Sequence, residues 1–538
     1  MQQNGAHRLA ALTGKAWFWP AAIVILALAP RLVFVAVSEH PGLWDPTEYY
    51  LLATNLHEGR GFTLDYIWNF ASDPAGVTHP LDHWLPLPGI VAAGSFALFG
   101  VSAPAALLPF ALLGAAQSLM VYAFARRIEA SHNVQVFAAL ATAWMPWLFL
   151  SSLHTDTTTL FGVLGFGSMA AVYLGVREDG RWLWAAGLLA GLAALTRNDG
   201  VMLIPAGVLA AGWLIWRGDP RPRWIHVFGA GIAFALALLP WIARNQSELG
   251  APWPGSAVRA MFVTDHEDFY AYSKDISLAA YLDQGAPAIV GKIAFELAAS
   301  VKLMATLVEL IFPVAILGGL WEAWRTRHRL PEPGPENFPG RFDLAPYAGG
   351  LFFILLTFGA YGVLMPYLSQ GGSFKKAYLA MVPFLLIIGA RAAERYVRPQ
   401  SAYRLTIALT LALLLANAVE LTRADFKLNN DQKAIYEDIG AELDRLQAGE
   451  EREIIVMTRD PWSVNFVTGY RAVMAPNEPL DVILQVADRY GVTHLLAPVP
   501  REAINAIDRG AASSPRLERI VEFPEHGLHL YRIVPANQ

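Results

Sequence analysis

The sequence contains no cysteine, and this absence excludes disulfide bonds, thiolate metal sites and a cysteine nucleophile. It says little about the compartment, because an exported bacterial domain can lack cysteine as well. Charged residues are also scarce: they make up 16% of the 538 residues. The net charge is −5 and there is no polybasic tail, so the composition gives no sign of a nucleic-acid partner.

Apolar residues dominate instead. They form 55% of the chain, with seventeen tryptophans and a mean hydropathy of +0.36, which is too apolar for a soluble enzyme of this length. A membrane-spanning helix needs about 20 mostly apolar residues. Eleven stretches fit, of which the pair within 182–216 is the least clear: 16–37, 103–125, 133–151, 159–176, 182–196, 200–216, 224–242, 301–324, 345–367, 376–394 and 404–421. The first has no small-residue cleavage site, so we interpret it as a retained span and not a signal peptide.

The distribution of lysine and arginine predicts the orientation. The N-terminal segment and the loops on its side carry seventeen of these cations, against nine in the opposite loops before the C-terminal tail. Cytoplasmic loops carry the excess of cations in membrane proteins. We therefore expect a multi-pass protein of the inner or plasma membrane with a cytoplasmic N-terminus, and an odd number of spans puts the C-terminal tail outside.

The chain is predicted to have two domains. Residues 1–424 form an all-helical transmembrane domain with two long outer loops, 38–102 and 243–300, and an interfacial or re-entrant helix is expected within 85–100. Residues 425–538 have the composition of a small soluble α/β domain. Its expected helices are 431–447 and 480–490, and its expected strands are 453–458, 494–497 and 528–533. No internal repeat is visible.

The most informative motif follows the first span, in the run Leu43-Trp44-Asp45-Pro46-Thr47-Glu48-Tyr49-Tyr50. Asp45 and Glu48 are three residues apart, so a helix would place both carboxylates on one face. Spacing alone favours a plain helix start, in which Asp45 caps, Pro46 takes the first turn and Glu48 completes a capping box. A second acid, Asp156, stands among threonines before the fourth span, where it also suits a helix cap.

The motif resembles the first outer loop of GT-C fold glycosyltransferases. This class includes protein O-mannosyltransferases, lipid A aminoarabinose transferases and bacterial family 39-like or RgtA/B/C/D-like proteins. The resemblance continues in order over about residues 15–420, and this order is its specific part. The further segments that match are Pro80 to Pro88, Leu153-His154-Thr155-Asp156, Gly191 to Arg197, Pro240 to Asn245 and Lys376 to Pro383.

The resemblance implies the roles of the candidate site residues. Asp45 falls on the catalytic aspartate of the class, and a carboxylate there can take the proton of an acceptor hydroxyl. Glu48 and Asp156 would orient the acceptor or the base. A departing polyprenyl phosphate needs cations, and the outer candidates are Arg197, Arg244, Lys375 and Lys376. The alternative for these cations is a role as interfacial anchors at lipid headgroups.

A departure from the pattern concerns metal dependence. Where many relatives have a basic residue and paired prolines, this chain has His79-Pro80-Leu81-Asp82-His83-Trp84. His79, Asp82 and His83 are compatible with a divalent ion, although hydrogen bonds from histidines to loop carbonyls are the commoner case. The sequence leaves a metal cofactor open.

The predicted function is glycosyl transfer from a polyprenyl-phosphate sugar to a protein, lipid or glycan acceptor at the outer face of the membrane, with inversion expected from the family. The main rival is a transporter or flippase of a lipid-linked substrate, because buried ionisable residues also mark transport pathways. A polysaccharide ligase or polymerase and a non-catalytic scaffold are further rivals. Against transport, the polar residues collect in outer loops and not at mid-membrane positions.

Overall fold

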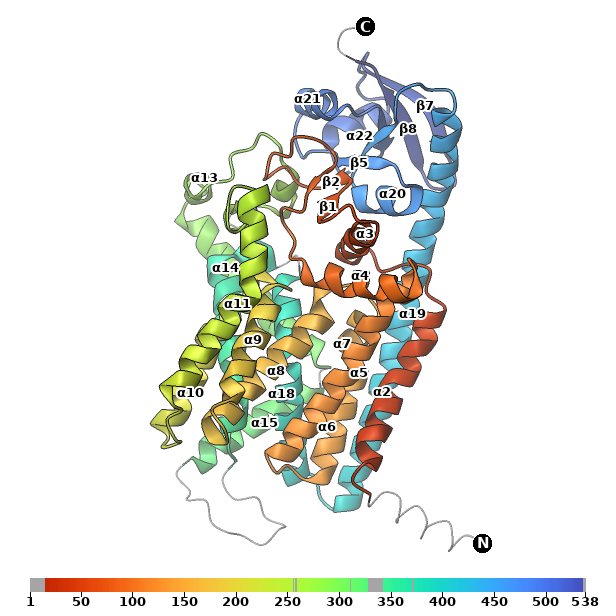
Figure 1. Cartoon of the computed structure of the whole chain (residues 1–538). Helices are drawn as coiled ribbons and strands as arrows, with labels where there is room; N and C mark the ends of the chain where they lie inside the picture. The colour runs from red at the N-terminus through yellow and green to blue at the C-terminus, as the bar shows by residue number, and fades with distance from the viewer. Residues whose placement is uncertain are drawn as a thin grey trace, which may run out of the picture.

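A computed structural model describes residues 15–254, 256, 259–309, 311–327, 342–369 and 372–535. The described chain is a bundle of helices that carries a small sheet domain at one end (Figure 1). Three of the seventeen cations used to orient the chain, Arg8, Arg329 and Arg341, lie outside the described residues.

The bundle is built from long apolar helices, and eight in the described part are long and apolar enough to cross a membrane. A ninth span results if the pair α14 and α15, bent by 104°, is one span. The helices of these spans are α2 (Phe18–Ala36), α5 (Ala103–Arg127), α8 (Thr157–Arg177), η1 (Asn198–Met202) with α10 (Leu203–Trp216), α11 (Trp224–Glu248), α14 (Ala286–Leu307), α15 (Ile311–Thr326), η4 (Ala345–Tyr347) with α16 (Ala348–Gly359) and η5 (Ala360–Leu364), α18 (Ser373–Tyr396) and α19 (Gln400–Gln447).

Two predicted spans correspond to shorter helices. The stretch 133–151 is divided into α6 (His132–Trp144) and α7 (Pro146–Ser151), because Pro146 lacks an N–H and disfavours a helical residue before it. The stretch 182–196 contains only α9 (Trp182–Ala194), which packs against α8 and α11. These two stretches account for the difference between eleven predicted spans and nine. The predicted multi-span helical fold is confirmed.

The first long loop, 38–102, forms a layer on the sheet end of the bundle. Its elements are α3 (Asp45–His57), β1 (Thr63–Leu64), β2 (Tyr66–Ile67), β3 (His79–Pro80) and α4 (Leu87–Phe99). Figure 1 shows α4 lying across the end of the bundle, and the Ser95 hydroxyl ties it to the backbone of Ala105. The helix expected within 85–100 is therefore confirmed.

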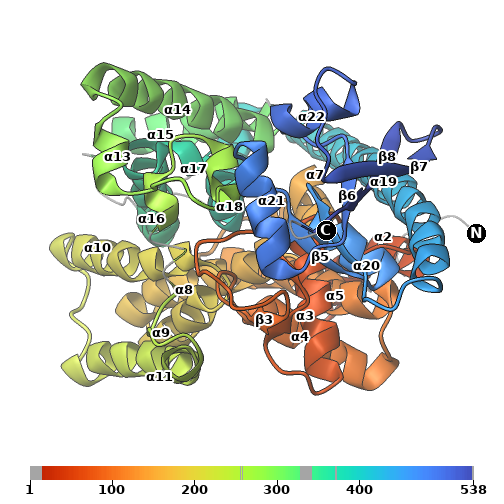
Figure 2. The ribbon, with the colours of Figure 1, turned by 90° about the horizontal axis from the view of Figure 1, so that it is seen from above.

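The second long loop, 243–300, connects the end of α11 to α14 through η2 (Ala260–Phe262), η3 (His266–Tyr270) and α13 (Leu278–Leu282). Seen from the sheet end, α13 and α14 lie on one side of the molecule and the sheet domain covers another (Figure 2). The two are joined by polar contacts: the Glu478 carboxylate accepts hydrogen bonds from the backbone N–H groups of Tyr272 and Ser273, at 2.7 and 2.8 Å.

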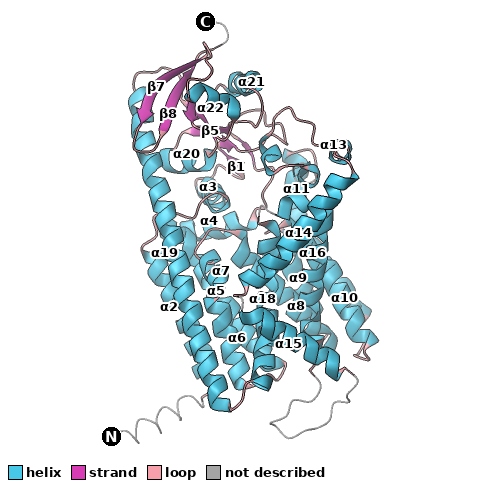
Figure 3. Ribbon diagram, turned by 180° about the vertical axis from the view of Figure 1, so that it is seen from behind, coloured by secondary structure: helices cyan, strands magenta, loops and turns pink. Residues whose placement is uncertain are grey.

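The C-terminal part forms a six-stranded sheet in the order β2-β5-β4-β6-β8-β7, seen in magenta in Figure 3. β4, β5 and β6 are parallel, whereas β8 and β7 are antiparallel additions. The elements are β4 (Ile455–Thr458), α20 (Pro461–Thr468), β5 (Arg471–Met474), α21 (Leu480–Tyr490), β6 (His494–Ala497), α22 (Glu502–Asp508), β7 (Leu517–Phe523) and β8 (Leu528–Ile533). The α/β character and the predicted helix 480–490 are confirmed.

The two predicted domains are closely joined. β2 of the first long loop pairs in parallel with β5, with Tyr66 opposite Ala472. α19 has 48 residues and runs without a break through the predicted boundary at residues 424 and 425. At 1.5 Å per residue it is about 72 Å long, more than twice the hydrocarbon thickness, so it also carries the sheet domain. The division at 424/425 stays a prediction.

Candidate active site

Asp45 is the first residue of α3, and the chain turns sharply before it. Trp44 has a φ of 59°, in the region that residues other than glycine rarely adopt, and such strain is typical of functional sites. The Thr47 hydroxyl donates to the carbonyl of Gly42 at 2.6 Å, and the Thr155 hydroxyl donates to the carbonyl of Pro46 at 2.5 Å. These bonds fix the start of α3 against the start of α8.

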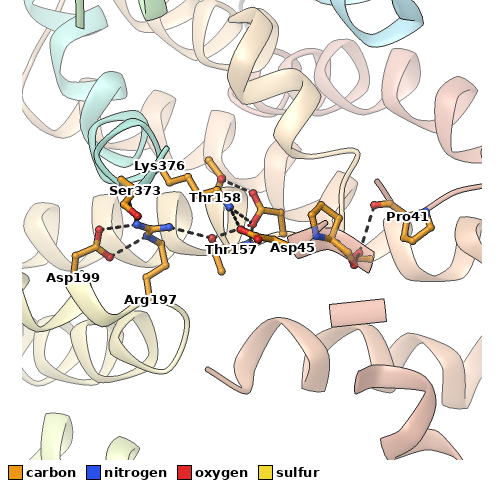
Figure 4. A network of polar contacts seen from close by, with 11 residues as sticks. Pro41, Asp45, Thr157, Thr158, Arg197, Asp199, Ser373 and Lys376 are labelled. Atoms are coloured by element: carbon orange, nitrogen blue, oxygen red, sulfur yellow. Dashed lines mark hydrogen bonds and ion pairs between the residues drawn. The ribbon is translucent and has the colours of Figure 1, made fainter. Parts of the chain in front are cut away.

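Asp45 and Asp156 meet at a shared lysine. Lys376 Nζ, near the start of α18, donates to Asp45 Oδ2 at 2.7 Å and to Asp156 Oδ1 at 2.9 Å (Figure 4). Asp156 also caps α8, because its carboxylate accepts from the N–H of Thr157 and the hydroxyl of Thr158. Burial acts to raise the pKa of Asp156, but Lys376 and these hydrogen bonds outweigh it and hold the pKa well below its usual range. Asp156 therefore remains a carboxylate in this site.

A second charged group adjoins the first. Arg197 donates two hydrogen bonds of 2.9 Å to Asp199, from Nε and Nη2. Its Nη2 also donates to the carbonyl of Ser373 at 3.0 Å. Its Nη1 lies 3.4 Å from Thr157 Oγ1, so the two groups form one network along α8 and the start of α18 (Figure 4). Tyr361 donates to Asp199 at 3.2 Å. The Arg197 charge is thus already paired with a carboxylate.

Glu48 lies in a different environment, although it is one turn from Asp45. It is fully buried, and its Oε2 accepts a hydrogen bond of 2.9 Å from Trp462 Nε1 of the sheet domain. Trp462 lies against Trp68, which stacks on Trp84, with ring centroids 5.7 Å apart in each pair. Burial raises the pKa of Glu48 well above its ordinary value, and the Trp462 bond only partly opposes this. The surroundings of Glu48 therefore favour its protonated, neutral form.

The other predicted cations are placed apart from the aspartate pair. Lys375 Nζ lies over the Trp147 ring, 3.1 Å from its centroid, and pairs with no carboxylate in the described part of the chain. Arg244 donates to the backbone carbonyls of Leu81 and Phe62, at 2.6 and 3.0 Å, and stacks on Trp241. Arg244 therefore holds two points of the first long loop, where a charged donor compensates buried carbonyls.

The residues considered for a metal do not converge. His79 Nε2 lies 3.9 Å from Asp82 Oδ1, and His79 Nδ1 lies 3.0 Å from the carbonyl of Val77. The ring of His83 packs edge-on against Trp68, and burial lowers its pKa to about 4. Within the described residues, no group of three histidine, aspartate or glutamate side chains could hold a metal ion. His79 thus contacts a backbone carbonyl and His83 packs against an aromatic ring, as structural histidines do.

Sequence reasoning missed three participants in these networks: Asp199, Tyr361 and Trp462. Asp199 could have been found, because an acid two residues after an arginine at a membrane boundary is an expected partner. Tyr361 and Trp462 carry no such signal, since each is 162 or 414 residues away from the carboxylate that it contacts.

Comparisons with known proteins agree with this architecture. Residues 78–243 match the family described as dolichyl-phosphate-mannose-protein mannosyltransferase. The crystal structure of ArnT from Cupriavidus metallidurans bound to undecaprenyl phosphate is similar, with a TM-score of 0.58 and 14% identity over 97% of this chain and 99% of that one. The oligosaccharyltransferase AglB from Archaeoglobus fulgidus, in complex with an inhibitory peptide and a dolichol-phosphate, has a TM-score of 0.53 and 13% identity over 89% of this chain and 69% of that one. No curated protein sequence matches the chain.

At such identities the structural matches establish the fold, and the family match is confined to the segment from β3 to α11. The segment contains Asp156 and Arg197 but begins after Asp45. The resemblance found in the sequence is confirmed at the level of the fold: the chain is a multi-pass membrane protein similar in structure to ArnT and AglB, membrane glycosyltransferases of the GT-C fold, and its residues 78–243 match the mannosyltransferase family.

Proposed function

We propose that this chain transfers a sugar from a polyprenyl-phosphate donor to an acceptor hydroxyl, with Asp45 as the general base. The observation that carries this proposal is the pair of aspartates on Lys376. The Asp45 side chain is 31% exposed and the Asp156 side chain 8% exposed, so Asp45 is the one that an acceptor can approach. A positioned carboxylate speeds proton transfer by about 10²–10⁴-fold.

The proposed step is a single displacement. The acceptor oxygen forms a bond to the anomeric carbon, the bond from that carbon to the phosphate oxygen breaks, and the acceptor proton passes to Asp45. The polyprenyl phosphate leaves with the bonding electrons. Because attack and departure occur on opposite faces of the anomeric carbon, the product is inverted relative to the donor.

Asp156 and Lys376 would serve as positioning groups. Lys376 holds the Asp45 carboxylate at 2.7 Å, and Asp156 fixes the lysine from the capped start of α8. With two carboxylates on one ammonium, the local charge is negative. A phosphate group would therefore be drawn to cations at the edge of this pair.

Lys375 suits the donor phosphate best among the predicted cations. It adjoins Lys376 in the chain, and its ammonium faces an aromatic ring and not a carboxylate. Arg197 is neutralised by Asp199, so it would support the site through Ser373 and Thr157. A phosphate contact of Arg244 stays a prediction from the sequence. The undecaprenyl phosphate bound to ArnT and the dolichyl-phosphate-mannose for which the matching family is named support a polyprenyl-phosphate carrier.

The reaction would occur at the sheet end of the bundle, which the charge bias predicts to be outside. The cations at the opposite end of the bundle include Arg126, Arg177 and Arg391. They lie within α5, α8 and α18, near the C-terminal end of each helix. We therefore propose a cytoplasmic N-terminus and an extracytoplasmic sheet domain.

The test is transfer of radiolabelled sugar from a panel of polyprenyl-phosphate sugars, in membranes containing wild type, Asp45→Asn or the matched control Asp65→Asn. Asp65 lies in the same loop, where it pairs with Arg60. We expect Asp45→Asn to lower transfer by about 10²–10⁴-fold and Asp65→Asn to leave it within a few-fold.

Two outcomes would contradict the proposal. Transfer that persists in Asp45→Asn at matched expression would remove the base from its role. Absence of transfer with any donor in the wild type would favour the transporter and scaffold alternatives.

A further inference from the structure

Two arginines stand at the carboxyl ends of neighbouring parallel strands in the sheet domain. Arg459 directly follows β4, and Arg501 lies between β6 and α22. After β4 the chain continues to β5, which lies on one side of the β4–β6 pair, and after β6 it continues to β7 and β8, which lie on the other side. The loops after β4 and β6 therefore diverge at a topological switch point, the place where open α/β sheets bind ligands.

The second long loop fills this place with a carboxylate. Glu267 of η3 accepts a hydrogen bond of 3.1 Å from Arg459 Nη2 and one of 2.6 Å from Arg501 Nη1. Tyr270, one turn further on, lies under Arg459, with the guanidinium carbon 3.9 Å from the ring centroid. Glu267 thus occupies the crevice in the manner of a bound anion, although it belongs to another part of the chain.

The charges in the crevice do not balance. Two guanidinium groups share one carboxylate, and Arg459 and Arg501 form no other ion pair in the described part of the chain. Arg501 is only 2% exposed, and its Nη2 has no hydrogen-bond partner among the described residues. A buried cation without full pairing is costly. Burial lowers the pKa of Arg501, and Glu267 only partly opposes this.

The remaining contacts of Arg501 hold it in place. Nε donates to the carbonyl of Ala475 at 3.0 Å, and Nη1 also donates to the carbonyl of Pro500 at 2.8 Å. The guanidinium is thus fixed by the backbone after β5 and β6, with Nη2 left over. A fixed arginine with an unpaired N–H donor, beside a second arginine, can donate parallel hydrogen bonds to two oxygens of a phosphate or a carboxylate.

We propose that Arg459 and Arg501 form an anion site that binds a phosphate monoester group of the acceptor, in competition with Glu267. When the acceptor anion takes the place of Glu267, η3 moves out of the crevice, while Glu478 continues to hold Tyr272 and Ser273 to the sheet domain. The site is distinct from the reacting hydroxyl, and it anchors the acceptor through the sheet domain. The binding site itself needs no catalytic step, whereas its link to the acceptor rests on the proposed function.

The position of the crevice fits such an anchor. Asp460 and Trp462 follow Arg459 directly, and Trp462 contacts Glu48 of the Asp45 helix. An acceptor held at Arg459 would therefore lie on the same side of the sheet domain as Asp45.

The first test measures binding of inorganic phosphate to the purified full chain, by the shift in thermal unfolding at constant ionic strength. Glu267→Gln should bind phosphate at least 10-fold more tightly than wild type, because it no longer competes. Arg459→Gln and Arg501→Gln should lose the phosphate-dependent shift. Arg459 has the more exposed side chain of the two, at 26%, so its variant keeps the test valid if Arg501→Gln does not fold.

Glu478→Gln is the matched control. Glu478 also joins the second long loop to the sheet domain, but its carboxylate accepts from the backbone of Tyr272 and Ser273 and forms no ion pair with an arginine among the described residues. Phosphate affinity in Glu478→Gln should equal that of wild type. Equal gains in Glu267→Gln and Glu478→Gln, or a phosphate shift that survives in Arg459→Gln, would overturn the proposal.

A second measurement follows Glu267 itself. Phosphate should increase hydrogen exchange in η3, residues 266–270, of wild type, and it should have no such effect in Arg459→Gln. Unchanged exchange at saturating phosphate would contradict the displacement. Nanodiscs of phosphatidylcholine with phosphatidic acid, compared with phosphatidylcholine alone, distinguish the sources: competition with free phosphate assigns the site to a lipid-borne group, and absence of competition assigns it to a soluble one.

Failure of this inference can be told apart from failure of the proposed function. Transfer that survives Asp45→Asn contradicts the general base and leaves phosphate binding untouched. Loss of transfer in Asp45→Asn, combined with unaltered phosphate response in the arginine variants, contradicts the anion site alone.

Discussion

Asp45 and Glu48 are both acids on the first turn of α3, yet they lie in opposite surroundings. Asp45 faces the ends of the spans, where Lys376 donates to it and part of its side chain is open to solvent. Glu48 faces the sheet domain, where it lies beside tryptophans and accepts a hydrogen bond from the neutral indole of Trp462. Two acids three residues apart in the sequence therefore lie in a charged and in an apolar environment.

The neighbouring groups of each carboxyl group determine whether it can act as a base. A carboxylate beside an ammonium stays ionised and can accept a proton from a substrate, whereas one in an apolar cage keeps its own proton. Glu48 is thus poorly suited to act as a base at neutral pH. Its contact with Trp462 suits it to position α3 beneath the sheet domain, and its role in the reaction stays a prediction.

Removal of Lys376, the cation beside Asp45, should have the largest effect. Lys376→Met leaves Asp156, with 6% of its surface exposed, without its ammonium partner. Loss of one partner from a buried pair costs about 3–5 kcal/mol, so the unfolding temperature of the purified protein should drop sharply. Asp156→Asn added to Lys376→Met should recover part of the loss, because it removes the orphaned charge. A single variant as stable as wild type would contradict this account.

The charge state of Glu48 can be tested through pH. The folded protein holds the proton of Glu48 more tightly than the unfolded chain does, because its pKa is raised. The free energy of unfolding should therefore fall as pH rises from about 4.3, the pKa of free glutamate, toward the raised value, by at most about 1.4 kcal/mol per pH unit. Glu48→Gln cannot ionise and should lack this part of the slope. Chemical denaturation at several pH values measures it, and identical slopes would show that Glu48 is charged when folded.

The hydrogen bond from Trp462 to Glu48 joins the sheet domain to α3, and its loss should have the weakest effect of the three changes. Trp462→Phe removes the 2.9 Å hydrogen bond to Glu48 and keeps most of the aromatic packing. The loss should be about 0.5–1.5 kcal/mol of stability, together with a several-fold slower transfer because α3 carries Asp45. Tyr470→Phe is the control, since it removes an exposed bond to Asp444 in the same domain. Equal effects of the two variants would separate Trp462 from the active site.

The sequence pointed to several residues of the candidate site, whose roles stay predictions, because ionisable groups are rare in membrane-spanning segments. Asp45, Asp156, Arg197 and Lys376 each interrupt or border an apolar run, and an ionisable residue there marks a candidate site. The structure brings these four together within one network. Lys376 was expected to bind phosphate, and its place between two carboxylates was not foreseeable, because spacing along the chain does not show which charges meet across helices.

Hydropathy and local motifs depend on neighbours in the chain, so the sequence sufficed for the membrane class, most of the apolar spans and the α/β character of the tail. Asp45 was selected by the family resemblance, and its catalytic role stays a prediction. Only the tertiary structure decided that β2 enters the sheet, that Trp462 covers Glu48, and that Glu267 lies between Arg459 and Arg501. These contacts join residues roughly 190 to more than 400 positions apart. Their energies come from burial and from charge pairing across separate elements, and neither leaves a periodic trace in the sequence.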